Sequence, residues 1–171
     1  MEVVLFYAAA AVSLIATTLV ISRLDASHGL IYLIISLLGV AVIFYLLGAP
    51  FAAALEVVIY AGAIMVLFLF VVMMLSQGRR GSDAERAFLS PRMWIGPAAL
   101  TSVLFLEVIY TLAERSTVSS GVVVTPKTVG IALFGPYILA VELSSILLLA
   151  ALLGAFHFGR PYMRARREEI E

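Results

Sequence analysis

Residues 51–75 of the chain read FAAALEVVIYAGAIMVLFLFVVMML and carry one charge, at Glu56. A helix that crosses a bilayer needs roughly 20 mainly apolar residues, and this stretch is long enough. Only helices and closed barrels cross a bilayer, because every backbone group must find a hydrogen-bond partner there. The strands of a barrel alternate apolar and polar residues, whereas this stretch is apolar almost throughout. It therefore predicts a transmembrane helix.

The whole chain has the composition of a membrane protein. Of its 171 residues, 63% are hydrophobic and 13% are charged, whereas a soluble domain is about half apolar and about a quarter charged. Eleven basic residues balance eleven acidic ones, so net charge does not point to nucleic acid. The chain has no cysteine, which excludes cysteine-ligated iron–sulfur clusters, thiol catalysis, disulfides and cysteine zinc sites. The two imidazoles, His28 and His157, are explained more simply as interfacial residues than as haem ligands.

Charged and helix-breaking residues divide the chain into five predicted spans. The sequence Gly48-Ala49-Pro50 interrupts a long uncharged stretch, and Pro ends a helix because it lacks an N–H and clashes with the preceding turn. Two polar segments predict loops. The predicted fold class is an all-α integral membrane protein, with a single five-helix domain over residues 1–160 and a tail that is basic and then acidic. The spans are expected at about residues 3–22, 29–47, 51–75, 93–113 and 133–157, the loops at 76–92 and 114–130, and the tail at 161–171.

The basic residues predict the orientation, because Lys and Arg are enriched on the cytoplasmic side of membrane proteins. With the N-terminus outside, the outer segments hold only Arg115 and Lys127, and the inner segments hold the other nine basic residues. The sequence therefore predicts an external N-terminus and a cytoplasmic C-terminus. The nine are Arg23, Arg79, Arg80, Arg86, Arg92, Arg160, Arg164, Arg166 and Arg167.

Three carboxylates interrupt the apolar spans, and an ionisable group at bilayer depth is by default a functional hypothesis. Glu142 is the deepest, about 13 Å into its span at 1.5 Å per residue, and is expected to line a polar or hydrated path. Glu56 fits such a path and a helix contact equally well. Glu107 is expected to lean outward and to bond locally with Tyr110 and Thr111 one turn away.

The third span carries a polar end and a group of small residues. Gly62 and its neighbours Ala61 and Ala63 permit close helix approach. A second interpretation of the same residues is a local π-bulge, which often marks a functional position. Glu56 and Tyr60 are spaced to share a hydrogen bond or a water. Positions at three- and four-residue steps predict one helix-packing face, formed by Glu56, Tyr60, Ala63, Leu67, Phe70 and Met74.

The fifth span has further polar side chains near Glu142, namely Tyr137, Ser144 and Ser145. Serine hydroxyls in membrane helices often bond a carbonyl of their own helix. At least one of these serines is therefore expected to be satisfied locally.

Four segments resemble a known family. Residues 55–75 are similar to the third helix of subunit J of bacterial respiratory complex I, the counterpart of mitochondrial NADH dehydrogenase subunit 6. Supporting segments are HGLIYLIISLL at 28–38, LFGPYILAVEL at 133–143 and AFHFGR at 155–160. The resemblance covers roughly residues 1–160, and Glu107 is not part of it.

The resemblance implies a subunit of the membrane arm without a redox centre, a metal or a catalytic residue of its own. It implies the bacterial inner membrane as location and subunits K, A and H as partners, of which K is small and H belongs to the quinone site. FMN and iron–sulfur clusters are expected in other subunits. Conversion of a π-bulge in the third helix to regular α-helix is expected to open or close a hydrated path between the quinone side and subunit K. The expected gating residues are Tyr60, Ala61, Gly62, Ala63, Ile64, Met65 and Val66, and the expected polar network is Glu56, Tyr60 and Glu142.

The sequence leaves two alternatives open. The chain could be the homologous subunit of a related ferredoxin- or F420H2-dependent complex, since such complexes share the membrane arm. It could also be a small transporter that acts alone, although three carboxylates in the outer half do not make a continuous path across a membrane.

Overall fold

The computed structural model describes residues 2–23, 26–76, 91–113 and 123–168. These residues are helical almost throughout, with no strand among them, as the sequence predicts. They include five helices long and apolar enough to cross a membrane, at Val3–Ser22, Ala26–Leu46, Pro50–Leu75, Trp94–Ala113 and Ile138–Gly159. Each span overlaps one of the five predicted spans, so the predicted fold class is confirmed.

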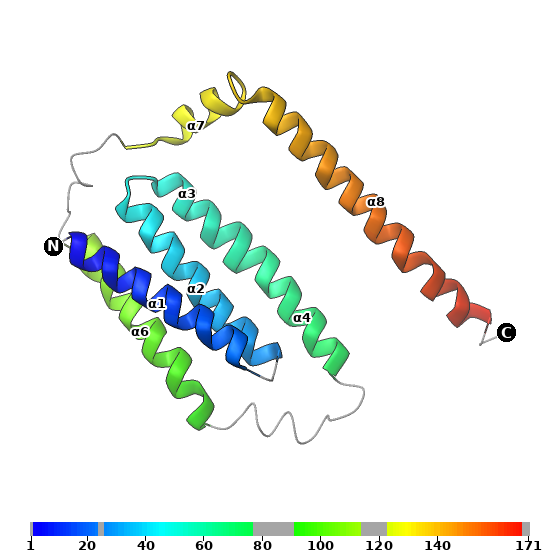
Figure 1. Ribbon diagram of the computed structural model, residues 1–171, viewed down its shortest axis with the longest axis horizontal. Coiled ribbons are helices and arrows are strands. Elements are labelled where there is room, and N and C mark those ends of the chain that lie inside the picture. Colours follow the sequence, from blue (N-terminus) through cyan, green and yellow to red (C-terminus); the bar gives the residue numbers. More distant parts are fainter. Residues whose placement is uncertain (1, 24–25, 77–90, 114–122, 169–171) are drawn as a thin grey trace. The chain divides into compact units, whose positions relative to one another are not determined.

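The first compact unit covers Met1–Thr125. Its helices are α1 (Glu2–Ser22), α2 (Ala26–Leu46), α3 (Pro50–Leu55), the π-helix η1 (Glu56–Ile64), α4 (Met65–Ser76) and α6 (Pro91–Ala113). The segments α3, η1 and α4 follow one another without a break and form the third span. Helix α2 contacts α1, α6 and all three segments of the third span, and α1 also contacts α6 (Figure 1).

The turn between α2 and α3 is built as the Gly48-Ala49-Pro50 sequence predicts. Gly48 has a φ of 82°, which an L side chain rarely adopts. The Ala49 N–H donates to the Phe44 carbonyl at 3.0 Å, which closes the end of α2, and Pro50 starts α3. The Val124 N–H donates to the Gly48 carbonyl at 2.9 Å. This bond holds the end of the first unit beside the turn.

Small residues bring α1, α2 and α6 close together. A Cβ at Gly39 would overlap the Ser13 hydroxyl and lie 3.4 Å from the Ala9 carbonyl oxygen. A Cβ at Gly96 would overlap the Tyr32 hydroxyl. Close packing of this kind holds membrane helices together without a hydrophobic driving force. The buried core of the bundle is Val12, Ala16, Tyr32, Ile35 and Leu104.

The second compact unit covers Pro126–Glu171 and contains α7 (Pro126–Leu133) and α8 (Ile138–Glu168). The sequence placed the start of the fifth span at residue 133, but α8 begins at Ile138, and residues 126–130 are helical rather than part of a loop. The physical reason is the pair Gly135-Pro136, because Pro136 cannot continue the ladder of α7. The Tyr137 N–H instead reaches back to the Ala132 carbonyl at 3.1 Å. Apolar flanking residues hid this turn in the sequence.

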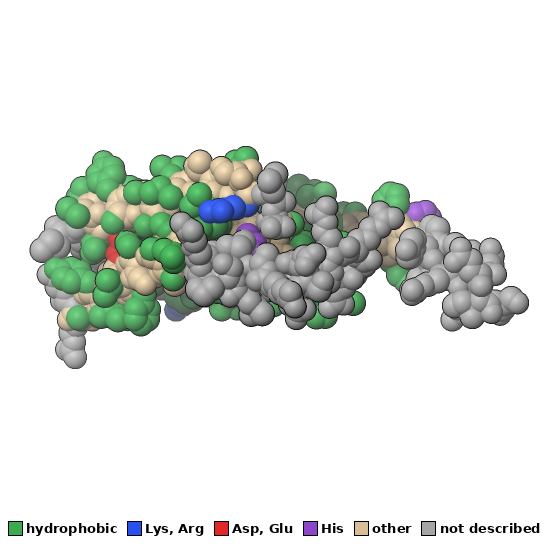
Figure 2. Space-filling view, turned by 90° about the horizontal axis from the view of Figure 1, so that it is seen from below, with side chains coloured by type: hydrophobic (Ala, Val, Ile, Leu, Met, Phe, Trp, Pro, Cys, Tyr) green, Lys and Arg blue, Asp and Glu red, His purple; other side chains and the backbone are tan. Residues whose placement is uncertain are grey.

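Much of the described surface is apolar. Figure 2 shows hydrophobic side chains over most of the described part of one face, with few charged ones among them. Large side chains such as Leu67, Phe70 and Leu147 expose 55–69% of their area within this chain. Exposed apolar side chains in such number indicate surfaces that contact lipid or partner proteins.

Candidate functional site

The third span is irregular in its N-terminal half, where η1 runs for nine residues from Glu56 to Ile64. The π-type hydrogen bonding extends one residue beyond η1, since the Met65 N–H donates to the Tyr60 carbonyl, five residues earlier. Five of the seven residues expected at the bulge lie in η1, and the other two, Met65 and Val66, lie in α4. Runs of π-helix are rare and usually occupy single turns at functional positions. The length of η1 makes it the most unusual backbone in the described chain.

Gly62 is the residue whose place in η1 has a specific steric reason. A Cβ at this position would lie 3.1 Å from the Val57 carbonyl oxygen, five residues earlier in the same helix. Such a contact is tight, so the Val57 carbonyl would have to move by a few tenths of an ångström. In a π-helix the carbonyl five residues back is the one that accepts the N–H. A side chain at 62 therefore presses on the group that defines the π form.

The third span packs on α2 through a different face from the one that the sequence predicts. Its buried side chains are Ala53, Ala61 and Met65, each at most 8% exposed. On the predicted packing face, Tyr60, Leu67, Phe70 and Met74 are 51–63% exposed within this chain. The helix-packing interpretation of that face is therefore wrong for contacts inside the chain. A π-helix has more residues per turn than an α-helix. Positions three and four residues apart in η1 therefore no longer lie on one face.

Glu56 stands at the first position of η1 and is half-buried. Tyr60 is 51% exposed, and no hydrogen bond joins its hydroxyl to the Glu56 carboxyl within the described residues. Both groups remain available to water or to a neighbouring protein at this end of the span. Their role in a proton path remains a prediction.

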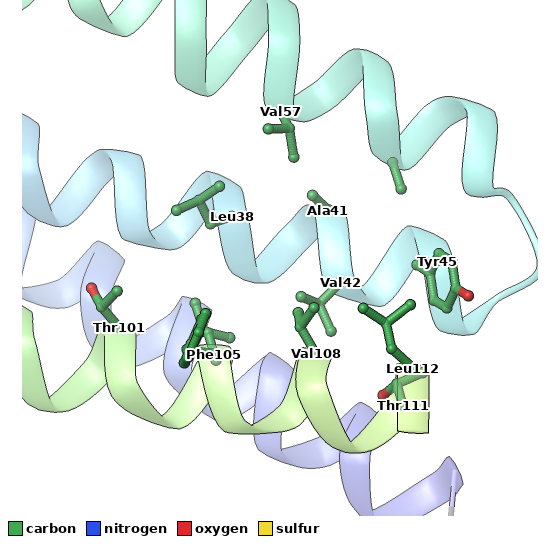
Figure 3. A pocket seen from close by; sticks show the side chains of 12 residues that line it. Leu38, Ala41, Val42, Tyr45, Val57, Thr101, Phe105, Val108, Thr111 and Leu112 are labelled. Carbon is green, nitrogen blue, oxygen red and sulfur yellow. The ribbon is translucent and has the colours of Figure 1, made fainter. Parts of the chain in front are cut away.

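An apolar groove of about 330 Å³ lies between α2, α6 and the start of η1. In Figure 3, Val57 of η1 approaches the groove from above, while side chains of α2 and α6 form its walls. The side chain of Val57 thus borders free space, while its carbonyl is the group that Gly62 approaches. The lining residues are Leu38, Ala41, Val42, Tyr45, Ala53, Val57, Thr101, Leu104, Phe105, Val108, Thr111 and Leu112.

The polar group of the fifth span is largely satisfied by its own helix. The Ser144 hydroxyl donates to the Ala140 carbonyl at 2.7 Å, and the Ser145 hydroxyl to the Glu142 carbonyl at 2.7 Å. These bonds confirm the expected local role of the serines. Tyr137 lies in the turn before α8 rather than on the helix, and the Glu142 side chain is exposed within this chain.

Glu107 is the carboxylate whose environment the sequence mispredicts. It is 5% exposed on α6, and neither carboxyl oxygen has a hydrogen-bond partner in the described chain. The Thr111 hydroxyl donates at 2.8 Å to the Glu107 backbone carbonyl rather than to the carboxyl group. A signal was present in the spacing, since Gly96, Leu100, Leu104 and Glu107 follow one another at four- and three-residue steps on the inward face. The depth of Glu107 along the span does not by itself reveal this face.

The described residues hold no group of three or more His, Cys, Asp or Glu that could bind a metal ion. The side chains that distinguish the third span are apolar or singly polar. The distinctive features of the described third span are its π-helical backbone, the groove beside it and the carboxyl group of Glu56.

Comparison with known proteins gives one consistent family. The family described as NADH-ubiquinone/plastoquinone oxidoreductase chain 6 matches residues 4–158. NADH-quinone oxidoreductase subunit J of Pseudomonas aeruginosa is 53% identical over 158 residues, which is 91% of this chain and 95% of that protein. The subunit J of Escherichia coli is 50% identical over 156 residues, 91% of this chain and 85% of that protein. The subunit J of Buchnera aphidicola from Schizaphis graminum is 50% identical over 158 residues, 91% of this chain and 96% of that protein.

Proposed function

The chain belongs to the family of NADH-ubiquinone/plastoquinone oxidoreductase chain 6, as a membrane-arm subunit of NADH-quinone oxidoreductase, and we propose that its third span gates a hydrated path during turnover. The observation that carries the proposal is the nine-residue η1, in which a Cβ at Gly62 would lie 3.1 Å from the Val57 carbonyl oxygen. The subunit would couple quinone reduction to proton pumping by changing the form of this segment.

A change from π to α form would turn one part of the span against the other. An α-helix has 3.6 residues per turn, so each residue taken out of a wide turn rotates the following helix by about 100°. Helix α3 lies before η1 and α4 lies after it, so the rotation would move α4 relative to α3. The bulky side chains of Val66 and Phe68, 56% and 51% exposed, would then exchange places with others at the same depth.

Two features support an easy exchange between the forms. The groove beside Val57 offers space into which the backbone around it could shift. The third span contacts α2 chiefly through small side chains, Ala53 and Ala61, together with the flexible Met65. A gate of this kind works when its two forms differ by only a few kcal/mol, because small changes then shift the populations strongly.

The remaining parts of the proposal concern the surroundings of the subunit. It would lie in the bacterial inner membrane with its N-terminus outside, and would hold subunits K, A and H in place through its exposed apolar surfaces. Glu56, Tyr60 and Glu142 would border the hydrated path. Electron transfer through FMN and iron–sulfur clusters would take place in other subunits, and this chain would take no part in it.

The experiment that tests the gate is the substitution Gly62→Ala. Ala is favoured over Gly in an α-helix by about 1 kcal/mol, and its Cβ would crowd the Val57 carbonyl in the π form. Both effects favour the α form, so NADH:quinone turnover and proton pumping should fall about fivefold. NADH oxidation by an artificial acceptor, measured in the same membranes, should persist.

The matched control is Gly29→Ala. Gly29 lies in the regular helix α2, where a Cβ would meet the Val20 carbonyl oxygen at an ordinary contact distance of 3.5 Å. This variant should keep both activities. Normal turnover and pumping in Gly62→Ala would contradict the gate, and an equal loss of both activities would make Gly62 a packing residue.

A further inference from the structure

The groove between α2, α6 and the start of η1 has a buried floor and exposed sides. Ala41 of α2, Ala53 of α3 and Leu104 of α6 form the floor, each at most 7% exposed. Val57 and Val108 line the sides and are 42% and 38% exposed (Figure 3). The short side chains of Ala41 and Ala53 leave the space that larger residues would fill. The groove is therefore open to the medium around the bundle.

The length of the groove matches one leaflet of a bilayer. Its lining on α6 runs from Thr101 to Leu112, about 16 Å at 1.5 Å per residue. The hydrocarbon core of a bilayer is about 30 Å thick, so each leaflet contributes about 15 Å. On α2 the lining ends at Tyr45, close to the turn at Gly48, and tyrosine rings prefer the membrane interface. The groove thus runs from near the middle of these spans to one end of them.

The width of the groove decides which occupant fits. A volume of about 330 Å³ over a length of about 16 Å gives a cross-section of about 20 Å², that of a rod about 5 Å wide. One straight hydrocarbon chain has this thickness, because carbon atoms in contact lie about 3.5–4.0 Å apart. A helix with its side chains is about 10–12 Å wide and is too thick to enter. An isoprenoid chain is branched along its whole length and is also thicker.

Water is a poor occupant of the groove. Its lining is apolar except for Tyr45, Thr101 and Thr111. The Thr111 hydroxyl already donates to the Glu107 carbonyl at 2.8 Å, and Thr101 and Tyr45 lie toward opposite ends of the groove (Figure 3). A buried water needs about 2–4 polar partners, and cavities with apolar walls stay dry and take up apolar molecules. The apolar medium around a membrane span is the hydrocarbon of the lipids.

We propose that the groove binds one acyl chain of a phospholipid, with the ester end of the chain beside Tyr45 and its methyl end toward Thr101. The chain fills the seam between α6 and the third span. An acyl chain is deformable, so it yields when the backbone near Val57 shifts. The site is therefore compatible with the gate in η1 but does not rest on it.

The test is photochemical cross-linking of the assembled complex in vesicles of phosphatidylethanolamine and phosphatidylglycerol. The vesicles contain a trace of phosphatidylethanolamine with a diazirine midway along one acyl chain, and the labelled residues of this subunit are identified by mass spectrometry. We expect labels on α2 between residues 38 and 45. Helix α2 has no exposed residue from 27 to 46, so a lipid that only coats the outer surface leaves these positions unlabelled. The complex is kept without NADH, which makes the result independent of the gate.

The matched pair Val108→Trp and Val103→Trp then tests the groove itself. Both valines lie on α6 and are 38% and 44% exposed, but only Val108 lines the groove. Val108→Trp should lower the labelling of α2 at least fivefold, and Val103→Trp should leave it unchanged. The yield of intact complex shows that each variant assembles. If Val108→Trp does not assemble, Leu112→Trp fills the end of the same groove.

Three results would overturn the proposal. The first is the absence of label between residues 38 and 45 of α2 in the native complex, which would mean that a protein side chain or nothing fills the groove. The second is equal labelling of α2 in the two tryptophan variants. The third is loss of the label when an excess of a long-chain quinone is added, which would assign the groove to isoprenoid chains.

Discussion

The bundle of α1, α2 and α6 and the third span use glycine for opposite purposes. In the bundle, Gly39 and Gly96 let side chains of neighbouring helices come into contact, with Ser13 and Tyr32 filling the space of the missing Cβ atoms. In the third span, a Cβ added at Gly62 would meet the Val57 carbonyl oxygen of its own helix. The first arrangement lets neighbouring helices pack closely, and the second leaves space beside a carbonyl of the same helix. The difference fits our proposal of a convertible helix beside a fixed scaffold.

The largest expected effect comes from filling a scaffold glycine. Gly39→Leu would overlap Ser13 and press on the Ala9 carbonyl, and overpacking of this kind costs about 1–3 kcal/mol or more. The amount of assembled complex should fall roughly tenfold or further, since about 1.4 kcal/mol corresponds to a factor of ten. Quinone-linked and artificial-acceptor activities in the membranes should then fall together, in contrast to Gly62→Ala.

Gly154→Leu on α8 is the control for that prediction. Nothing in the described chain lies within 4 Å of a Cβ at Gly154, so the substitution adds the same volume without the overlap. Normal assembly of Gly39→Leu, measured by the yield of intact complex, would show that the bundle is not a fixed scaffold.

A smaller effect is expected from the carboxyl groups near the proposed path. Glu56→Gln and Glu142→Gln keep much of the hydrogen bonding and remove only the titrating proton. One net hydrogen bond is worth about 1 kcal/mol, so quinone-linked turnover should fall by about fivefold at most. Complete loss of turnover in a fully assembled Glu142→Gln complex would make Glu142 a main relay. The main proton-transfer residue of this chain would then lie in the fifth span rather than the third.

The sequence predicts the spans well because length and apolarity decide whether a helix crosses a bilayer. The sequence also predicts the turn at Gly48, since Gly and Pro act there through local backbone geometry. The sequence does not predict the extent of η1, because the choice between hydrogen bonds to the fourth and to the fifth preceding carbonyl depends on tertiary packing. A glycine among small residues suggested an irregular helix without giving its limits.

The burial of Glu107 escapes prediction from the sequence for a different reason. Its depth in the span was evident, but its burial depends on which face of α6 meets α1. The stripe that runs from Gly96 through Leu104 to Glu107 would have indicated that face. Glu142, which the sequence favoured as a functional carboxylate, is exposed within this chain, and Glu56, for which a path and a helix contact were equally open, is half-buried.

The most direct test of the convertible helix compares two buried positions on either side of η1. Ala53 precedes η1 and Met65 follows it, and both are buried, at 7% and 8% exposure. This chain has no cysteine of its own, so Ala53→Cys and Met65→Cys each introduce one thiol, and labelling by a small permeant maleimide can be read from the mass of the subunit. Rotation of α4 predicts that Met65→Cys reacts several times faster while NADH reduces quinone than at rest, whereas Ala53→Cys stays slow in both states. Equal labelling of Met65→Cys at rest and during turnover would contradict the gate.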